Sequence, residues 1–208
     1  MPTVDRVVLV PVKSFADAKA RLAPVLSPAH REQLARWTTE RVLAAAGELP
    51  VFVACDDEGV AAWATEHGAS VLWHPGVGLN AAVNNSLRDL REGGADHIVI
   101  AHGDLPRARR LADTIIANTL TLVPDALGDG TNVIALPASM QFECAYGPSS
   151  FERHLTRALH DHLPVAVRRD PLLAIDIDTP SDLAHPMVQE VLPSWLPTNP
   201  ANHNPAPV

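Results

Sequence analysis

The sequence predicts an α/β protein with a mostly parallel sheet and helices on both of its faces. Short runs rich in β-branched residues alternate along the chain with helix-like stretches, which is the pattern of successive βαβ units. The run His97–Ala101 is almost entirely apolar, as expected for a strand in the middle of such a sheet. Glycines and prolines separate many of the segments.

The first half of the chain alternates predicted strands and helices. Val7–Val12 is the first strand. Ser27 and Pro28 then open a helix that runs to about Ala46, because a capping hydroxyl precedes a proline at the first helical position. The next predicted elements are the strand Val51–Cys55, the helix Glu58–His67, the strand Ala69–Trp73, the helix Asn80–Glu92 and the strand His97–Ala101.

The second half is predicted to continue with shorter elements and to end in a helix. Thr179 and Pro180 open this last helix for the same reason as Ser27 and Pro28. The preceding elements are a helix near Arg109–Asn118, a strand over Thr121–Val123, a loop over Pro124–Asn132, a strand over Val133–Leu136, a helix over Ser150–His162, and strands over Val165–Arg168 and Leu172–Ile177.

The 208 residues are enough for one domain and its core, which we assign to residues 1–192. The segment 193–208 contains five prolines and no charged residue. It also contains two asparagines that flank His203. We expect this Pro/Asn-rich tail to be disordered, because such a composition does not build a core.

Charge and hydropathy exclude two classes of partner. A formal net charge of -8 repels polyanions, so no nucleic-acid partner is expected. No apolar run reaches the roughly 20 residues that a membrane span requires, so no membrane partner is expected either. The first residues lack an export signal, and Cys55 and Cys144 form no disulfide or zinc motif, so we expect a cytoplasmic protein.

Three cations lie in the loop after the first predicted strand: Lys13, Lys19 and Arg21. Ligands of open α/β sheets bind at the carboxyl ends of strands, where these side chains are placed to hold a polyphosphate. A solvated basic loop is the alternative interpretation.

Three aspartates follow apolar runs. Asp104 comes shortly after His97–Ala101 and is either a metal ligand or the N-cap of the next helix. Asp176 and Asp178 are two residues apart, so in an extended chain both face one side. Their repulsion favours a dication with oxygen ligands, with a solvated strand end as the alternative.

Three glycine-containing segments are candidates for ligand contacts. The loop before Asn132 has glycines that let main-chain amides approach a ligand, and Gly147 to Phe151 opens a helix with serine hydroxyls and free N–H groups. Gly76 to Asn80 lacks the third glycine of a dinucleotide fingerprint and is left as a base-binding loop. A plain turn and a simple serine cap remain the alternatives.

Taken in order, these motifs resemble the 2-phospho-L-lactate and phosphoenolpyruvate guanylyltransferase family of coenzyme F-420 biosynthesis, from about Val8 to Leu183. The resemblance rests on Pro-Val-Lys and Ala-Lys-x-Arg-Leu between Pro11 and Leu22, Gly-Leu-Asn at Gly78, Gly-Asp-Leu-Pro at Asp104, Gly-Asp-Gly-Thr-Asn at Thr131, Tyr-Gly-Pro-x-Ser-Phe at Gly147 and Asp-Ile-Asp-Thr-Pro at Asp176.

The resemblance implies a Rossmann-like nucleotidyltransferase fold of the nucleotide-diphospho-sugar transferase type. It implies GTP and a phosphorylated three-carbon acid as substrates and Mg²⁺ as cofactor. The sequence does not give the oligomeric state, so a monomer and a homodimer both stay open. The roles that it implies are metal binding by Asp104, Asp176 and Asp178, acid binding by Thr131, Gly147 and Ser150, and nucleotide binding by Lys13, Lys19, Arg21, Gly78, Leu79 and Asn80. Asp104, Lys13, Lys19 and Arg21 are the implied catalytic residues.

Two departures from the family pattern bear on acid specificity. The family commonly has glycine at the position of Ser149, and apolar residues where Arg107, Arg109 and Arg110 stand. The residues do not separate phosphoenolpyruvate, which we favour, from 2-phospho-L-lactate or 3-phosphoglycerate.

Three other functions stay open from the sequence. A nucleotidyltransferase that acts on a sugar phosphate or the molybdenum cofactor is disfavoured, because the segment from Lys13 to Leu22 has no glycine. A noncatalytic nucleotide-binding domain is disfavoured because all three aspartates are present. A phosphohydrolase usually carries its Asp-x-Asp pair on the first strand, whereas this pair lies near the end.

Overall fold

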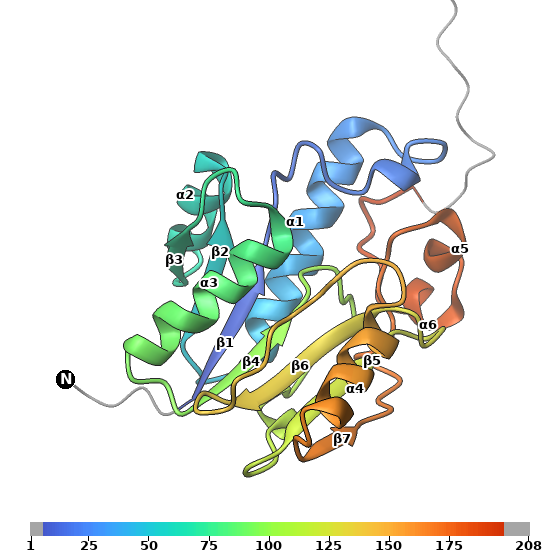
Figure 1. The fold of residues 1–208 in the computed structure, drawn as a ribbon. Coiled ribbons are helices and arrows are strands. Elements are labelled where there is room, and N and C mark those ends of the chain that lie inside the picture. The colour runs from blue at the N-terminus through green and yellow to red at the C-terminus, as the bar shows by residue number, and fades with distance from the viewer. Residues whose placement is uncertain (1–5, 198–208) are drawn as a thin grey trace, which may run out of the picture.

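The computed structural model describes residues 6–197, which form one twisted sheet covered by helices (Figure 1). Within these residues the sheet has seven strands in the order β3-β2-β1-β4-β6-β5-β7. The strands are β1 (Arg6–Pro11), β2 (Val51–Cys55), β3 (Ser70–Trp73), β4 (His97–Ala101), β5 (Leu120–Pro124), β6 (Thr131–Pro137) and β7 (Val165–Val167). The predicted α/β class is confirmed.

The sheet is parallel except at β6. Strands β1 to β4 pair in parallel, as do β5 and β7, whereas β6 runs antiparallel to both β4 and β5. Val133 therefore pairs with Ala101, so the beginning of β6 lies beside the carboxyl end of β4. This reversal brings Thr131 and the segment that follows β4 to the same edge of the sheet.

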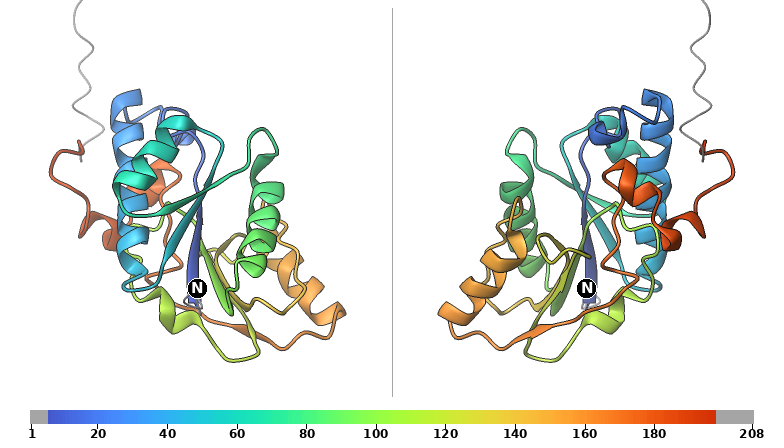
Figure 2. Two further views of the ribbon diagram at one scale, coloured as in Figure 1. Left: turned by 90° about the vertical axis from the view of Figure 1, so that its left-hand side faces the viewer. Right: turned by 90° about the vertical axis from the view of Figure 1, so that its right-hand side faces the viewer.

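Helices cover both faces of the sheet, as the two side views show (Figure 2). The helices α1 (Pro28–Ala45) and α2 (Glu58–Glu66) pack on one face, and α3 (Gly78–Glu92) and α4 (Ser150–His160) pack on the other. Ser27 caps α1 as predicted, because its hydroxyl accepts a hydrogen bond from the amide of His30 at 3.2 Å.

Two predicted elements are wrong. The helix expected near Arg109–Asn118 is only the 3-10 helix η2 (Leu111–Thr114), which follows Arg110 in a left-handed conformation. The strand expected over Leu172–Ile177 is extended near its end but joins no strand of the sheet. The segment does show the alternation of buried and exposed residues that suggested a strand, since Leu173, Ile175 and Ile177 are buried while the residues between them are partly exposed.

Two boundaries also differ from the prediction. α3 begins at Gly78, so Gly78, Leu79 and Asn80 form its first turn instead of a preceding loop. Strand β6 begins at Thr131. Thr131 and Asn132, which we had assigned to the preceding loop, therefore belong to this strand.

A third hydrophobic cluster lies apart from the two faces of the sheet. It joins Leu22, which ends the short η1 helix (Ala20–Leu22), and Leu34 of α1 to Ile175 and Ile177. Val188 of α6 (Pro186–Gln189) and Leu196 complete it, beside the short helix α5 (Pro180–Leu183).

The structure describes residues 193–197 of the tail that we expected to be disordered, and Leu196 among them is only 3% exposed. The rest of that tail, residues 198–208, lies outside the described residues. None of the helices in residues 6–197 is long and apolar enough to cross a membrane.

Candidate active site

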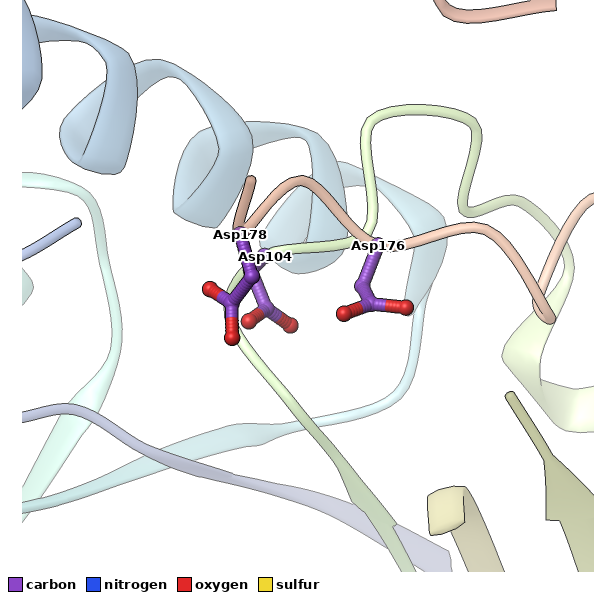
Figure 3. Close-up of side chains that lie close together, drawn as sticks. All are labelled: Asp104, Asp176 and Asp178. Atoms are coloured by element: carbon purple, nitrogen blue, oxygen red, sulfur yellow. The ribbon is translucent and has the colours of Figure 1, made fainter. Parts of the chain in front are cut away.

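Three carboxylates meet at the carboxyl edge of the sheet (Figure 3). Asp104 lies in the turn after β4, where no helix follows for it to cap, and Asp176 and Asp178 lie on the extended segment that passes beside it. The amide of Ile177, between them, donates to the carbonyl of Asp104 at 3.2 Å. One oxygen from each carboxylate lies within 4.8 Å of the others. The alternation that buries Ile175 and Ile177 is what turns both neighbouring aspartates toward Asp104.

Lys19 joins this cluster from the loop after β1. Its Nζ atom lies 3.0 Å from Asp104 Oδ2 and 3.0 Å from Asp178 Oδ1, and its side chain is only 7% exposed. The loop turns at Lys19 itself, which has a left-handed backbone with φ of 56°. The structure therefore places Lys19 against the aspartates.

The charges of the cluster do not balance. Burial by itself lowers the pKa of Lys19, but attraction to Asp104 and Asp178 outweighs it and leaves the pKa raised. The pKa of Asp104 is lowered, because the attraction of Lys19 outweighs the opposite effect of burial. Burial, with repulsion from Asp104 and Asp178, raises the pKa of Asp176 to about 7. With all three carboxylates ionised, one ammonium group neutralises one of them, and two negative charges remain.

A divalent cation fits this arrangement. The Asp104 Oδ1 atom is buried and has no hydrogen-bond partner among residues 6–197. Carboxylate oxygens are the ligands preferred by hard cations such as Mg²⁺, and a dication would balance the two remaining charges. The donor set, its spacing and its unsatisfied oxygen all suit one divalent ion.

The residues predicted to bind the acid gather near the same edge. Thr131 begins β6, and the amide of His102 donates to the carbonyl of the next residue, Asn132, at 3.1 Å. Gly147 and Ser150 lie on the turn that opens α4, which we call the 147–150 turn. Gly147 is exposed with a φ of 125°, whereas Thr131 and Ser150 are buried.

His154 of α4 joins β6 to the segment before this turn. Its Nε2 atom accepts from the amide of Ala145 at 2.8 Å, and its Nδ1 atom lies 3.0 Å from the Thr131 hydroxyl. Burial lowers the pKa of His154 to about 4, so the ring is neutral at pH 7. A neutral ring that accepts at Nε2 carries its proton on Nδ1 and donates it to Thr131. The hydroxyl hydrogen of Thr131 is then free for another acceptor.

A second contact joins the same segment to the proposed nucleotide-binding turn. The side-chain amide of Asn80 accepts from the Tyr146 amide at 2.7 Å and donates to the Tyr146 carbonyl at 3.1 Å. Asn84, one turn later, pairs in the same way with the main chain of Cys144. The Asn80 side chain therefore positions the residue before Gly147.

Lys13 and Arg21 are less closely placed. Lys13 lines a small pocket with Gly78 and Leu79, at the ends of β1 and β2. Arg21 lies exposed in η1, and among the described residues no contact joins it to the three aspartates. Arg107 is occupied elsewhere, since its guanidinium donates to the carbonyl of Met187 in α6 at 2.8 Å.

Three aromatic residues of the site were not among the predicted site residues. The ring of His102 packs edge-on against Tyr146, with centroids 4.7 Å apart, and Tyr146 packs in the same manner against His154 at 5.2 Å. His102 lies two residues before Asp104, and Tyr146 belongs to the Tyr-Gly-Pro-x-Ser-Phe motif, so both had a signal in the sequence. His154 gives no such signal, because its partners are 9 and 23 residues away.

Comparison with known proteins identifies a family that matches most of the chain. The family model described as "Guanylyl transferase CofC like" matches residues 6–190. A phosphoenolpyruvate guanylyltransferase of Sphaerobacter thermophilus is 34% identical over 186 residues, which cover 85% of this chain and 90% of that protein. One of Mycobacterium marinum is 37% identical over 195 residues, 88% of either chain.

Solved structures share the fold at lower identity. A nucleotidyl transferase from Methanothermobacter thermautotroptrophicus superposes with a TM-score of 0.58 at 19% sequence identity, covering 86% of this chain and 94% of that one. This likeness supports the Rossmann-like nucleotidyltransferase fold predicted from the sequence.

Proposed function

The chain belongs to the Guanylyl transferase CofC like family, and from that premise we propose that it transfers GMP from GTP to the phosphate of phosphoenolpyruvate and releases pyrophosphate. The observation that carries the proposal is the cluster of Asp104, Asp176 and Asp178. The relatives' names support the choice of phosphoenolpyruvate over 2-phospho-L-lactate.

The proposed reaction needs positioning more than proton transfer. An acceptor phosphate oxygen attacks the α-phosphorus of GTP, the bond from that phosphorus to the bridging oxygen breaks, and pyrophosphate leaves. The acceptor phosphate is already ionised at neutral pH, so a strong general base is unnecessary. The Thr131 hydroxyl, held by His154, donates to the acid together with Gly147 and Ser150 of the 147–150 turn.

The nucleotide is assigned to the ends of β1 and β2. We assign the small pocket lined by Lys13, Gly78 and Leu79 to the base, and Lys19 and Arg21 to the triphosphate. Mg²⁺ held by Asp104, Asp176 and Asp178 would supply charge neutralisation at the reacting phosphates.

We place the reaction in the cytoplasm. Cys55 and Cys144 are both buried free thiols, which suits a reducing compartment.

The proposal is tested by pyrophosphate release from the purified protein with Mg²⁺. GTP or ATP is paired in turn with phosphoenolpyruvate, 2-phospho-L-lactate and 3-phosphoglycerate. We expect release with GTP and phosphoenolpyruvate. Release only with another acid would transfer the assignment to that acid, and silence from folded protein in every combination would refute guanylyl transfer.

The role of the aspartates is tested with Asp104→Asn. We expect a loss of activity of at least about a thousandfold, because the variant lacks a charge that neutralises the metal and orients the phosphates. Asp113→Asn is the matched control, since among residues 6–197 the Asp113 carboxylate pairs only with an exposed arginine, Arg110, at 2.9 Å. Equal activity of the two variants would remove Asp104 from the proposed site.

A further inference from the structure

The 147–150 turn contains a residue in an unfavourable conformation. Ser149, at the N-cap of α4, has φ of 53° and ψ of 32°, which is the left-handed region. Residues with a Cβ atom rarely adopt this region, whereas glycine does so freely. The Ser149 hydroxyl does not cap the helix either. Something else must hold Ser149 in this conformation.

Asp129 contacts Ser149 and the backbone two residues after it. Its Oδ1 atom accepts from the Ser149 amide at 3.1 Å and from the Ser149 hydroxyl at 3.3 Å. Its carbonyl accepts from the amide of Phe151 at 3.0 Å. One residue of the β5–β6 loop therefore fixes Ser149 and the first turn of α4 together.

Asp129 is itself held in place by Asp125. The two carboxylate oxygens of Asp125 accept from the amides of Asp129, at 2.9 Å, and Gly130, at 2.7 Å. Thr131 follows immediately, so the same loop carries a residue assigned to the acid at one end and a contact to the 147–150 turn in its middle.

Attraction of the substrate does not explain why a carboxylate, Asp129, lies beside the 147–150 turn. Asp129 is exposed, and its negative charge lies beside a turn that we assign to an anionic acceptor, where it opposes binding. Simple attraction for substrate therefore does not account for it, whereas support of Ser149 does.

We propose that Asp129 is a positioning residue that keeps Ser149 left-handed and so orients Gly147 and Ser150 toward the acceptor acid. The inference rests on the proposed function, because it gives the 147–150 turn the acid as its ligand. In a chain with glycine at position 149, the same conformation would need no such support.

The test is a double-mutant cycle that measures the KM for phosphoenolpyruvate, the KM for GTP and kcat. Asp129→Ala should raise the KM for phosphoenolpyruvate about five- to tenfold, with kcat and the KM for GTP within about twofold, because only the acid-binding turn loosens. Ser149→Gly should be close to wild type. In the Ser149→Gly background, Asp129→Ala should change the KM by less than about twofold.

Two further variants distinguish the loss of the hydrogen bonds from Ser149 to Asp129 from the loss of the Asp129 charge and from misfolding. Asp129→Asn keeps the acceptor oxygen without the charge, so its KM for phosphoenolpyruvate should not rise above the wild-type value. Ser149→Val leaves Asp129 intact but disfavours the left-handed region, so it should raise the KM even if Asp129→Ala fails to fold.

Equal effects of Asp129→Ala in both backgrounds, or a KM for phosphoenolpyruvate raised as much by Asp129→Asn as by Asp129→Ala, would overturn the inference while leaving guanylyl transfer intact. Wild-type protein without turnover on any acid would instead overturn the proposed function, and this inference with it.

Discussion

Lys19 determines how much charge the aspartate cluster carries. Its ammonium group is the counter-ion of Asp104 and Asp178, at 3.0 Å from each. Lys19→Met should therefore lower the free energy of unfolding by about 2–3 kcal/mol without divalent metal. This loss is smaller than the loss expected on breaking a fully buried ion pair, because Asp178 is partly exposed. This corresponds to a fall in Tm of about 4–10 °C for a chain of this size.

Mg²⁺ should reduce that loss by more than half, because a dication supplies the charge that the lysine supplied. Thermal unfolding in EDTA and in saturating Mg²⁺ measures both effects. Lys13→Met is the control, since Lys13 is exposed and should leave the Tm unchanged under both conditions. A Lys19→Met protein as stable as wild type in EDTA would show that the lysine is not the required counter-ion.

Single residues of the site were predictable where the chemistry is local in sequence. Asp176 and Asp178 share one face because they are two residues apart, and Asp104 follows an apolar strand. The partners of His154 and Ser149 were not predictable, because each depends on the side-by-side packing of segments distant in sequence. The assignment of Lys13, Arg21, Gly78 and Leu79 to the nucleotide remains a prediction.

Helix α4 carries a pH-sensitive contact at His154. The folded state keeps this histidine neutral with a pKa of about 4, below the usual value near 6.5. The unfolded chain therefore binds the proton more tightly, and the contribution of His154 to stability is present above about pH 6.5 and is lost as the pH falls toward about 4. The loss should be on the order of 2–3 kcal/mol.

Urea unfolding of wild type and His154→Phe across this pH range measures the contribution. The variant is less stable at neutral pH, but its free energy of unfolding should fall less steeply with acid. Leu159→Ala is the control on the same helix, because it truncates an exposed side chain that carries no ionisable group. Identical slopes for wild type and His154→Phe would contradict the buried neutral ring.

Elements were predictable where a helix cap or a continuous apolar run marks them. The Ser27 cap and Pro28 gave the start of α1, and the apolar run His97–Ala101 gave β4. The helix near Arg109–Asn118 was wrong because Arg110 turns left-handed and only a 3-10 turn follows. The strand over Leu172–Ile177 was wrong because periodicity reports burial of alternate residues and is silent on whether a strand pairs with the sheet.

The third hydrophobic cluster joins Leu196, near the end of the described residues, to the segment that carries Asp176 and Asp178. Leu196 is 3% exposed and packs with Ile175 and Ile177, the two residues that flank Asp176. Leu196→Ala should lower the free energy of unfolding by about 2–4 kcal/mol, through lost burial and a residual cavity. Thermal unfolding measures this as a fall in Tm of about 4–15 °C.

Leu159→Ala is the control for that measurement. Leu159 is 59% exposed on α4, so its truncation should leave the Tm within about 2 °C of wild type. Equal Tm values for the two variants would mean that Leu196 does not belong to the packed domain, and that the tail begins near residue 193 after all.

The fold as a whole was accessible from the sequence, because alternating strands and helices admit few topologies. The reversal of β6 was not, since a strand's direction depends on how a loop connects it. That reversal matters for the proposed function, because it brings Thr131 to the edge of the sheet where β4 ends and Asp104 follows.

The most direct test follows the α-phosphorus of GTP. Wild-type protein is incubated with Mg²⁺, phosphoenolpyruvate and GTP labelled at the α-position, and the products are separated. The account predicts that the label joins the acid in one product, with one pyrophosphate released for each product formed, and that Asp104→Asn abolishes both. Label found only in free GMP or GDP would mean hydrolysis, and would contradict guanylyl transfer as the function of this site.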